Sequence, residues 1–111
     1  MAYPKRMGFE ELREIDFAAI TANYTAIGPS LTKPVRIVCF SNDTDQSLYI
    51  SLDGVTDHIK LSAGSFFLLD ISANKIRDEG WFISEGVVFY VKHAGVAPTL
   101  GDCNITVAIG V

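Results

Sequence analysis

The most constraining feature of this sequence is a series of short apolar runs, rich in β-branched and aromatic residues, that are separated by turn residues. Several runs alternate apolar with polar residues, the pattern of a strand with one face in a core. In one of them, Leu48, Ile50 and Leu52 share a face. The run Ser65–Ile71 is apolar on both faces, which favours a central strand. The runs predict strands over 35–40, 48–52, 65–71, 87–92 and 104–111.

Turn residues separate these runs at intervals of about 8–12 residues, which is typical of a sandwich or a barrel. Asp53-Gly54 and Glu85-Gly86 lie between strand-like runs and predict hairpins, the second of them between 81–83 and 87–92. The segment His93–Asp102 holds two Gly and one Pro and predicts a loop between the last two strands. We therefore expect an all-β, antiparallel β-sandwich, jelly-roll-like, of about eight short strands. A small barrel would give the same pattern.

The chain of 111 residues is long enough for one domain with one modest core. Residues 1–13 mix charged residues with Pro4 and Gly8, and we expect an extended N-terminal arm there. Residues 14–111 then form a single β-sandwich domain, whose first strand lies near 13–20. Helices are expected at most over 10–14 or 74–79, and each segment is too short to be stable alone.

The net charge of −4 and the scattered basic residues argue against nucleic-acid and anionic-membrane partners. Only Lys5-Arg6 forms a basic pair, whereas phosphate binding requires a positive stripe. No apolar run approaches the ~20 residues that span a bilayer. Residues 1–17 lack the apolar stretch of a signal peptide. These features predict a protein made in a cytoplasm.

The residue types that carry catalysis do not form a recognisable motif. His58 and His93 lack a neighbouring nucleophile, although a site assembled from distant positions stays open. Cys39 and Cys103 fit no metal spacing and lie in apolar runs, so we expect buried free thiols, or a disulfide if their strands are neighbours. The glycines are isolated and form no phosphate loop. We expect a protein without catalytic activity and without a cofactor.

Two pairs of carboxylates lie in turns, Asp43 with Asp45 and Asp53 with Asp57. Oxygen-rich turns can bind calcium, but these turns lack the Gly and the terminal Glu of an EF-hand loop. Asp also favours turns because its side chain bonds to the local backbone. We expect turn chemistry, and a cation site is the alternative.

Aromatic and apolar residues outside the expected core are candidates for contacts with a partner. Tyr49 and Tyr90 point away from the core if their strand neighbours point inward, and Trp81 starts a short run. Such rings suit either a glycan platform or a subunit contact. The expected partner contacts are Tyr3, Phe9, Tyr49, Tyr90, Val96 and Leu100.

Several short segments after residue 18 resemble small virion proteins of tailed bacteriophages. They are 20–28 (ITANYTAIG), 34–37 (PVRI), 50–58 (ISLDGVTDH), 63–65 (AGS), Asp70, 74–75 (NK) and 90–92 (YVK). The resemblance implies a β-sandwich component of the virion, assembled in the host cytoplasm, that acts by contacts. The expected role is capsid decoration, as a homo-oligomer such as a trimer bound to the major capsid protein. The alternatives are a neck or tail accessory or fibre-attachment protein, or a glycan-binding module.

Overall fold

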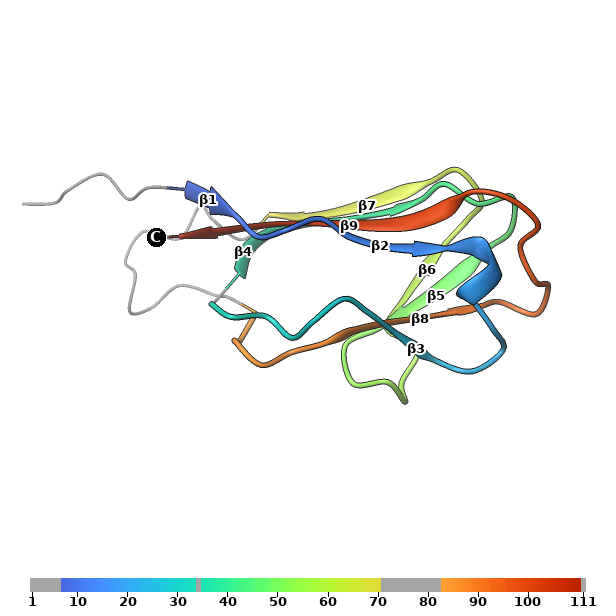
Figure 1. Cartoon of the computed structure of the whole chain (residues 1–111), viewed down its shortest axis with the longest axis horizontal. Helices are drawn as coiled ribbons and strands as arrows, with labels where there is room; N and C mark the ends of the chain where they lie inside the picture. Colours follow the sequence, from blue (N-terminus) through green and yellow to red (C-terminus); the bar gives the residue numbers. More distant parts are fainter. Residues whose placement is uncertain (1–6, 34, 71–82, 111) are drawn as a thin grey trace, which may run out of the picture.

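The computed structural model describes residues 7–33, 35–70 and 83–110 (Figure 1). This part of the chain is almost entirely β-structure, with one short 3-10 turn, η1. The elements are β1 (Met7–Phe9), β2 (Arg13–Asp16), η1 (Phe17–Ala19), β3 (Thr25–Ile27), β4 (Val35–Asn42), β5 (Leu48–Ser51), β6 (Ile59–Leu61), β7 (Phe66–Asp70), β8 (Phe89–His93) and β9 (Asp102–Gly110).

The strands form two antiparallel sheets packed face to face. The first sheet has the order β1-β9-β4-β7, with β2 also paired to β9, and the second has the order β3-β8-β5-β6. β1 and β2 follow one another along the same edge of β9, since Phe9 is opposite Ala108 and Arg13 is opposite Ile105. Taken together as one edge strand, they give eight strands in jelly-roll order. The expected β-sandwich is confirmed.

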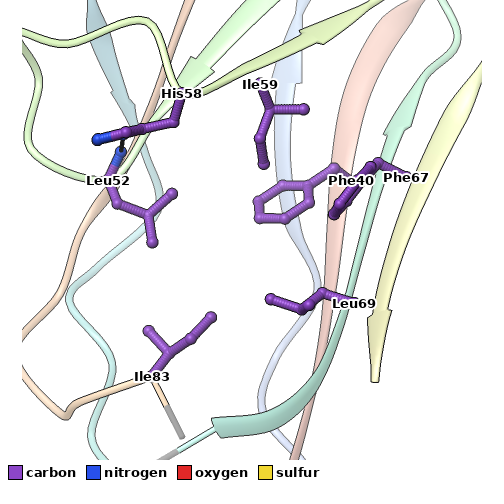
Figure 2. Close-up of a pocket in the computed structure, with 7 residues that line it drawn as sticks. All are labelled: Phe40, Leu52, His58, Ile59, Phe67, Leu69 and Ile83. Carbon is purple, nitrogen blue, oxygen red and sulfur yellow. Dashed lines mark hydrogen bonds between the residues drawn. The ribbon is translucent and has the colours of Figure 1, made fainter. Parts of the chain in front are cut away.

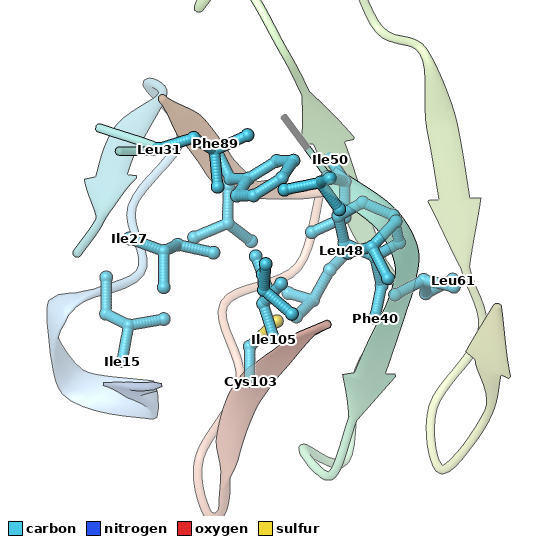
Figure 3. Close-up of a cluster of buried hydrophobic side chains, with 14 of the residues drawn as sticks. Ile15, Ile27, Leu31, Phe40, Leu48, Ile50, Leu61, Phe89, Cys103 and Ile105 are labelled. Atoms are coloured by element: carbon cyan, nitrogen blue, oxygen red, sulfur yellow. The ribbon is translucent and has the colours of Figure 1, made fainter. Parts of the chain in front are cut away.

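The core lies between the sheets and consists of the side chains that point inward from both of them (Figure 3). Phe40 of β4 meets Phe89 of β8 edge to face, with ring centres 5.3 Å apart. This contact joins the two sheets across the core, in the edge-to-face geometry that aromatic pairs favour. The fully buried large side chains include Ile27, Val35, Val38, Phe40, Leu48, Ile50, Phe89, Val91, Ile105 and Val107.

The prediction of a central strand over 65–71 was wrong. β7 ends the order of the first sheet and pairs with β4. Successive side chains of β7 point to opposite sides of the sheet. Phe67 packs towards Phe40, whereas Phe66 and Leu68 point outward and are 68% and 54% exposed. In this chain, the run that is apolar on both faces forms the last strand of its sheet, and its outward side chains are exposed.

The turn predictions had mixed outcomes. β5 and β6 form a hairpin around Asp53-Gly54, although their loop is longer than a two-residue turn. Glu85-Gly86 does form a turn, but the described residues beside it do not form the predicted hairpin, because Ile83 bridges to Val35 and β8 pairs with β3 and β5. Residues 81–82 of that prediction lie outside the described residues. The backbone of Leu31 bonds to both Gly86 and Val87 instead. The loop predicted over 93–102 is confirmed, and it carries the chain from the second sheet to the first.

The expected N-terminal arm differs from the structure in its described part. Met7–Phe9 is extended but paired with β9, and Arg13 is a buried residue of β2. The first strand predicted near 13–20 is β2 followed by η1, and the helix considered over 10–14 is absent there. Residues 1–6, with Tyr3, and the helix considered over 74–79 lie outside the described residues.

Candidate functional site

The outer face of the first sheet carries a contiguous set of apolar side chains. Directly opposite residues of antiparallel strands point to the same side, so the register defines this face. Cys39 of β4 lies opposite Leu68 of β7, and the next outward pair is Ser41 with Phe66. Ile37 lies opposite Asp70 of β7 on one side and opposite Ala108 of β9 on the other, and Ala108, which is 3% exposed, lies opposite Phe9 of β1. We call Phe9, Ile37, Cys39, Phe66, Leu68 and Ala108 the apolar sheet face.

The largest members of this face are exposed to solvent. Phe9 is 70% exposed, and Phe66 and Leu68 are exposed on the opposite flank. Outer faces of antiparallel sheets normally carry polar residues. Exposed large apolar side chains grouped on one face of a small protein mark a contact surface. The apolar sheet face is therefore the candidate functional site.

Side chains on this face are sorted by size across the sheet. The bulky Phe66 and Leu68 stand on β7 at one edge. Beside them, the outward positions of β4 hold the smaller Ser41 and Cys39, and β9 adds Thr106 opposite Cys39. The face thus has a ridge on β7 next to a shallower strip over β4 and β9.

The other end of the same outer face is acidic. Glu14 and Asp16 of β2 lie opposite Asn104 and Asp102 of β9. A hydrogen bond with the carboxyl of Asp102, and the negative charges of Asp102 and Asp16, raise the pKa of Glu14. The amide of Asn104 donates to Asp102 at 3.1 Å and to Asp43 at 3.0 Å. The acidic end is distinct from the apolar sheet face.

The second sheet has a different outer face, built around Lys92 of β8. Its Nζ lies 3.1 Å from Asp57 Oδ1, and 4.7 Å and 5.7 Å from the ring centres of Tyr24 and Tyr49. The Tyr24 hydroxyl donates to Asp57, and the Tyr24 and Lys92 hydrogen bonds hold the pKa of Asp57 below its usual value. Tyr90 completes this group on β8, and its partners along the sheet are Ala26 and Ser51. We call Tyr24, Tyr49, Asp57, Tyr90 and Lys92 the tyrosine–lysine cluster.

The loop between β5 and β6 folds over this cluster. Gly54 has a φ of +79°, and a Cβ at this position would lie 3.3 Å from the ring of Tyr90. Close approach to the ring and the left-handed backbone both favour glycine here. One side of the Tyr90 ring is therefore covered by the chain itself, as Lys92 covers Tyr24 and Tyr49.

Ser51, Asp53 and His58, in or beside this loop, are the residue types of a Ser–His–Asp triad, but their hydrogen bonds differ from those of a triad. Ser51 Oγ donates to Asp53 Oδ1 at 2.8 Å, and His58 Nδ1 accepts from the backbone of Leu52 at 3.1 Å. A Ser–His–Asp triad needs the serine bonded to the histidine. The N–H groups of Thr56 and Val55 also bond to Asp53 and, with Ser51, hold its pKa below the usual value. These bonds build a turn.

The carboxylates considered for a cation receive hydrogen bonds from protein donors. Asp45 accepts from the backbone N–H of Thr99 at 2.8 Å and from its hydroxyl. Asp43 accepts from Ser41 and Asn104, and Asp57 from Tyr24 and Lys92. Within 7–33, 35–70 and 83–110, no group of three or more His, Cys, Asp or Glu is placed to hold a metal. The arrangement supports turn chemistry at these positions.

A pocket of about 310 Å³ opens between the sheets beside β6 and β7 (Figure 2). Leu52 and His58 face Phe40, Phe67 and Leu69 across it, and Ile59 and Ile83 complete the described lining. The surface that these residues offer is apolar. The pocket is a gap in the core between the sheet edges.

The two cysteines are free thiols in different environments. Cys103 of β9 is fully buried, and this burial, with the negative charges of Asp102 and Asp43, raises the pKa of its thiol to about 12. Cys39 is half-buried on the apolar sheet face. Their strands are neighbours, but Cys39 lies opposite Thr106 and Cys103 lies opposite Asn42.

The structure distributes the predicted contact residues over three surfaces. Tyr49 and Tyr90 share the outer face of the second sheet. Val96 and Leu100, 58% and 57% exposed, share the loop between β8 and β9, while Phe9 lies on β1 beside the far end of β9 (Figure 1). Tyr3 and Trp81 are outside the described residues.

The sequence analysis did not identify the two largest side chains on the outer face of β7, or two members of the tyrosine–lysine cluster. Phe66 and Leu68 were placed in a core because their run is apolar on both faces. Tyr24 and Lys92 come from segments far apart in the chain, and only the pairing of β3 with β8 brings their neighbourhoods together. The available signal was a run of only four apolar residues, 66–69, that lies between Gly64-Ser65 and Asp70.

Scans of protein-family models and searches of curated proteins and of solved structures gave no match for this chain. In the described segments, none of the helical structure is long and apolar enough to cross a membrane.

Proposed function

We propose that this chain is a structural protein of a tailed-phage virion, most specifically a capsid decoration protein that binds and stabilises the assembled head. It acts through contacts and without catalysis. Its partners are other copies of itself and the major capsid protein, and its place is the virion, assembled in the host cytoplasm.

One observation carries the proposal: exposed apolar side chains gather on two separate surfaces of a jelly roll. The apolar sheet face presents Phe66 and Leu68, and the β8–β9 loop presents Val96 and Leu100 at the end where β9 begins. Two separated contact surfaces suit a chain that joins one neighbour to another. Repeated attachment to a lattice also gives avidity without strong single contacts. The jelly roll and the sequence resemblance support the same class by analogy.

The experiment is cryo-EM of virions from the phage that carries this gene, together with co-sedimentation of the purified chain with empty heads. We expect density for the chain at repeated positions on the head surface and co-sedimentation with the heads. The double variant Val96→Ser/Leu100→Ser is expected to lower the bound fraction at least about tenfold, since two buried apolar contacts are lost. Density at the neck or tail alone would favour the accessory role, and no virion density would contradict the proposal.

Glycan binding is the second candidate, because Tyr49 and Tyr90 are half-exposed on one sheet face. It has less support, since Lys92 and the backbone at Gly54 lie against the rings that a sugar would need. A glycan array decides the question with Tyr90→Ala as the matched variant. Binding that this variant abolishes would favour the glycan role, and an array without hits would remove it.

A further inference from the structure

We propose that the free edge of β7 pairs with β7 of a second copy of this chain, as two antiparallel strands related by a two-fold axis perpendicular to the sheet. The first sheets of the two copies then form one continuous sheet. The inference deepens the proposed function, on which it rests, because it names the contact through which copies of the chain meet.

The backbone of β7 offers hydrogen-bonding groups along its free edge. β7 is the last strand of the order β1-β9-β4-β7 and pairs with β4 on one side. The N–H of Asn42 donates to the carbonyl of Ser65 at 2.8 Å, so every second residue from Ser65 onward also bonds to β4. Phe66 and Leu68 lie between these positions. Their N–H and C=O groups therefore point away from β4, and no described strand pairs with them there.

The other edge strands of the sandwich carry features that discourage such pairing, and β7 does not. Edge strands are normally short or charged, because an exposed apolar edge pairs with other chains. β1 and β3 have three residues each, β6 has three with Lys60 in the middle, and β2 carries Glu14 and Asp16 on its outward side. β7 has five residues, and its charge is confined to Asp70 at the end. Among the described edges, β7 is therefore the one suited to pairing.

Side chains of β7 are exposed on both sides of the sheet. Phe66 and Leu68 are exposed on the outer side, and Phe67 is 42% exposed on the inner side although it packs towards Phe40. A molecule that lies on the outer face leaves Phe67 uncovered. A strand beside β7 contacts both rows, because side chains of paired strands lie about 5 Å apart. The occupant that these exposures indicate is an extended strand.

The sequence of β7 is complementary to itself in one antiparallel register. When Phe67 lies opposite Phe67 of the second copy, Phe66 lies opposite Leu68 of that copy, and the two-fold axis repeats the pair. The outward backbone groups of these two residues then bond to one another across the axis. Apolar side chains meet apolar side chains on both sides of the sheet, which identifies the strand as β7 of a second copy.

The same register keeps the carboxylates of β7 apart. Asp70 is level with Gly64 of the second copy, where among the described residues nothing lies within 4 Å of the position of a Cβ. The two Asp70 residues stand at opposite ends of the pair, about 20 Å apart along the strands. The acidic end on β2 and the start of β9 is separated from β7 by β4. In the register with Leu68 opposite Leu68, by contrast, Asp70 would lie beside Phe66.

Sedimentation velocity of the whole chain from about 10 μM to about 1 mM tests the pairing, which is weak because one short strand per copy is smaller than a standard interface. The 12.1 kDa monomer is expected to give way to a species of twice that mass. Leu68→Pro removes an outward N–H and leaves the bonds to β4 in place, so it should weaken pairing at least about tenfold. Leu68→Val keeps the N–H and is the matched control, with a change below about threefold. Phe66→Lys places a charge on the edge, keeps every backbone group and should also weaken pairing, so it decides the question if Leu68→Pro does not fold.

Disulfide formation tests the register in a chain that carries Cys39→Ser and Cys103→Ser. Phe67→Cys should give a disulfide-linked dimer under mild oxidation, because the two positions face each other across the axis. Leu68→Cys should give a lower yield, since its two copies are diagonal neighbours. A higher yield for Leu68→Cys would overturn the register.

A monomer at every concentration, a trimer as the limiting species, or pairing that neither Leu68→Pro nor Phe66→Lys weakens would overturn the inference. If the chain stays monomeric and still co-sediments with heads, the proposed function survives and the second-copy inference fails. If the chain pairs through β7 and does not bind heads, the inference stands and the proposed function fails.

Discussion

The two outer faces of the sandwich differ in how their large side chains are covered. On the second sheet, Lys92, Asp57 and Tyr24 bond to one another, and the loop at Gly54 covers Tyr90. On the first sheet, Phe66 and Leu68 are exposed, and within 7–33, 35–70 and 83–110 no loop covers them. The side chains of the second sheet's outer face contact one another, whereas the first sheet's outer face exposes apolar side chains that no contact among the described residues covers. The difference teaches that exposure of apolar groups, rather than the presence of aromatic rings, locates the contact surface.

The largest change in the free energy of unfolding is expected when an inward-pointing residue of the first sheet is replaced. Arg13 of β2 points inward and is 3% exposed, with its guanidinium 2.7 Å from Glu10 and its Nε bonded to the carbonyl of Pro29. Arg13→Met should lower the free energy of unfolding by about 3 kcal/mol, because it leaves Glu10 partly buried without its partner. Glu14→Gln, on the outward side of the same strand, is the matched control. Urea denaturation measures both, and equal effects would contradict the assignment of the two sides.

The thiols give a second contrast across the same sheet. Cys39 lies on the apolar sheet face and Cys103 in the core, where its thiol pKa is raised to about 12. Since the thiolate is the reactive form, labelling of Cys39 by a chromogenic disulfide should be at least about tenfold faster than labelling of Cys103. The variants Cys39→Ser and Cys103→Ser assign the two rates. Similar labelling rates for the two thiols in the folded protein would contradict the position of Cys39 on the outer face.

These two contrasts show what the sequence could and could not predict. Alternation located β5, β8 and β9, because one face of each strand must enter the core, and β-branched and aromatic residues located β4. It could not divide the strands between sheets, and β4 and β5 are neighbours in the chain but lie in different sheets. The position of β7 at an edge depends on pairing with β4, which is set by packing of the whole sandwich. Phe66 was therefore misplaced, and with it the candidate site.

On the second sheet, loss of the lysine should have a moderate effect. Lys92→Ala removes the cation over Tyr24 and Tyr49, which at a half-exposed site contributes about 1 kcal/mol to the free energy of unfolding. Lys60 of β6 lies opposite Tyr49 on the other side and serves as a control, since Lys60→Ala should change stability less. Thermal unfolding compares the two variants. A larger loss for Lys60→Ala would show that the cluster does not stabilise its own face.

The smallest effect on stability is expected on the apolar sheet face. Phe66→Ser and Leu68→Ser, measured at low concentration, should each change the free energy of unfolding by less than about 0.5 kcal/mol, because their side chains stand outside the core. The inward neighbour Phe67, which packs near Phe40, should cost more when changed to Ser. If Phe66→Ser unfolds the chain, the residue serves the fold and not a contact.

The most direct test of the central claim is a dilution series followed by amide NMR on the isotopically labelled chain of 111 residues. The claim is that the first sheet, and not the second, offers the contact surface. Concentration-dependent shifts are therefore expected at Cys39, Phe66 and Leu68, with little change at Tyr49 and Lys92. Shifts centred on the tyrosine–lysine cluster, or spectra unchanged up to about 1 mM, would contradict it.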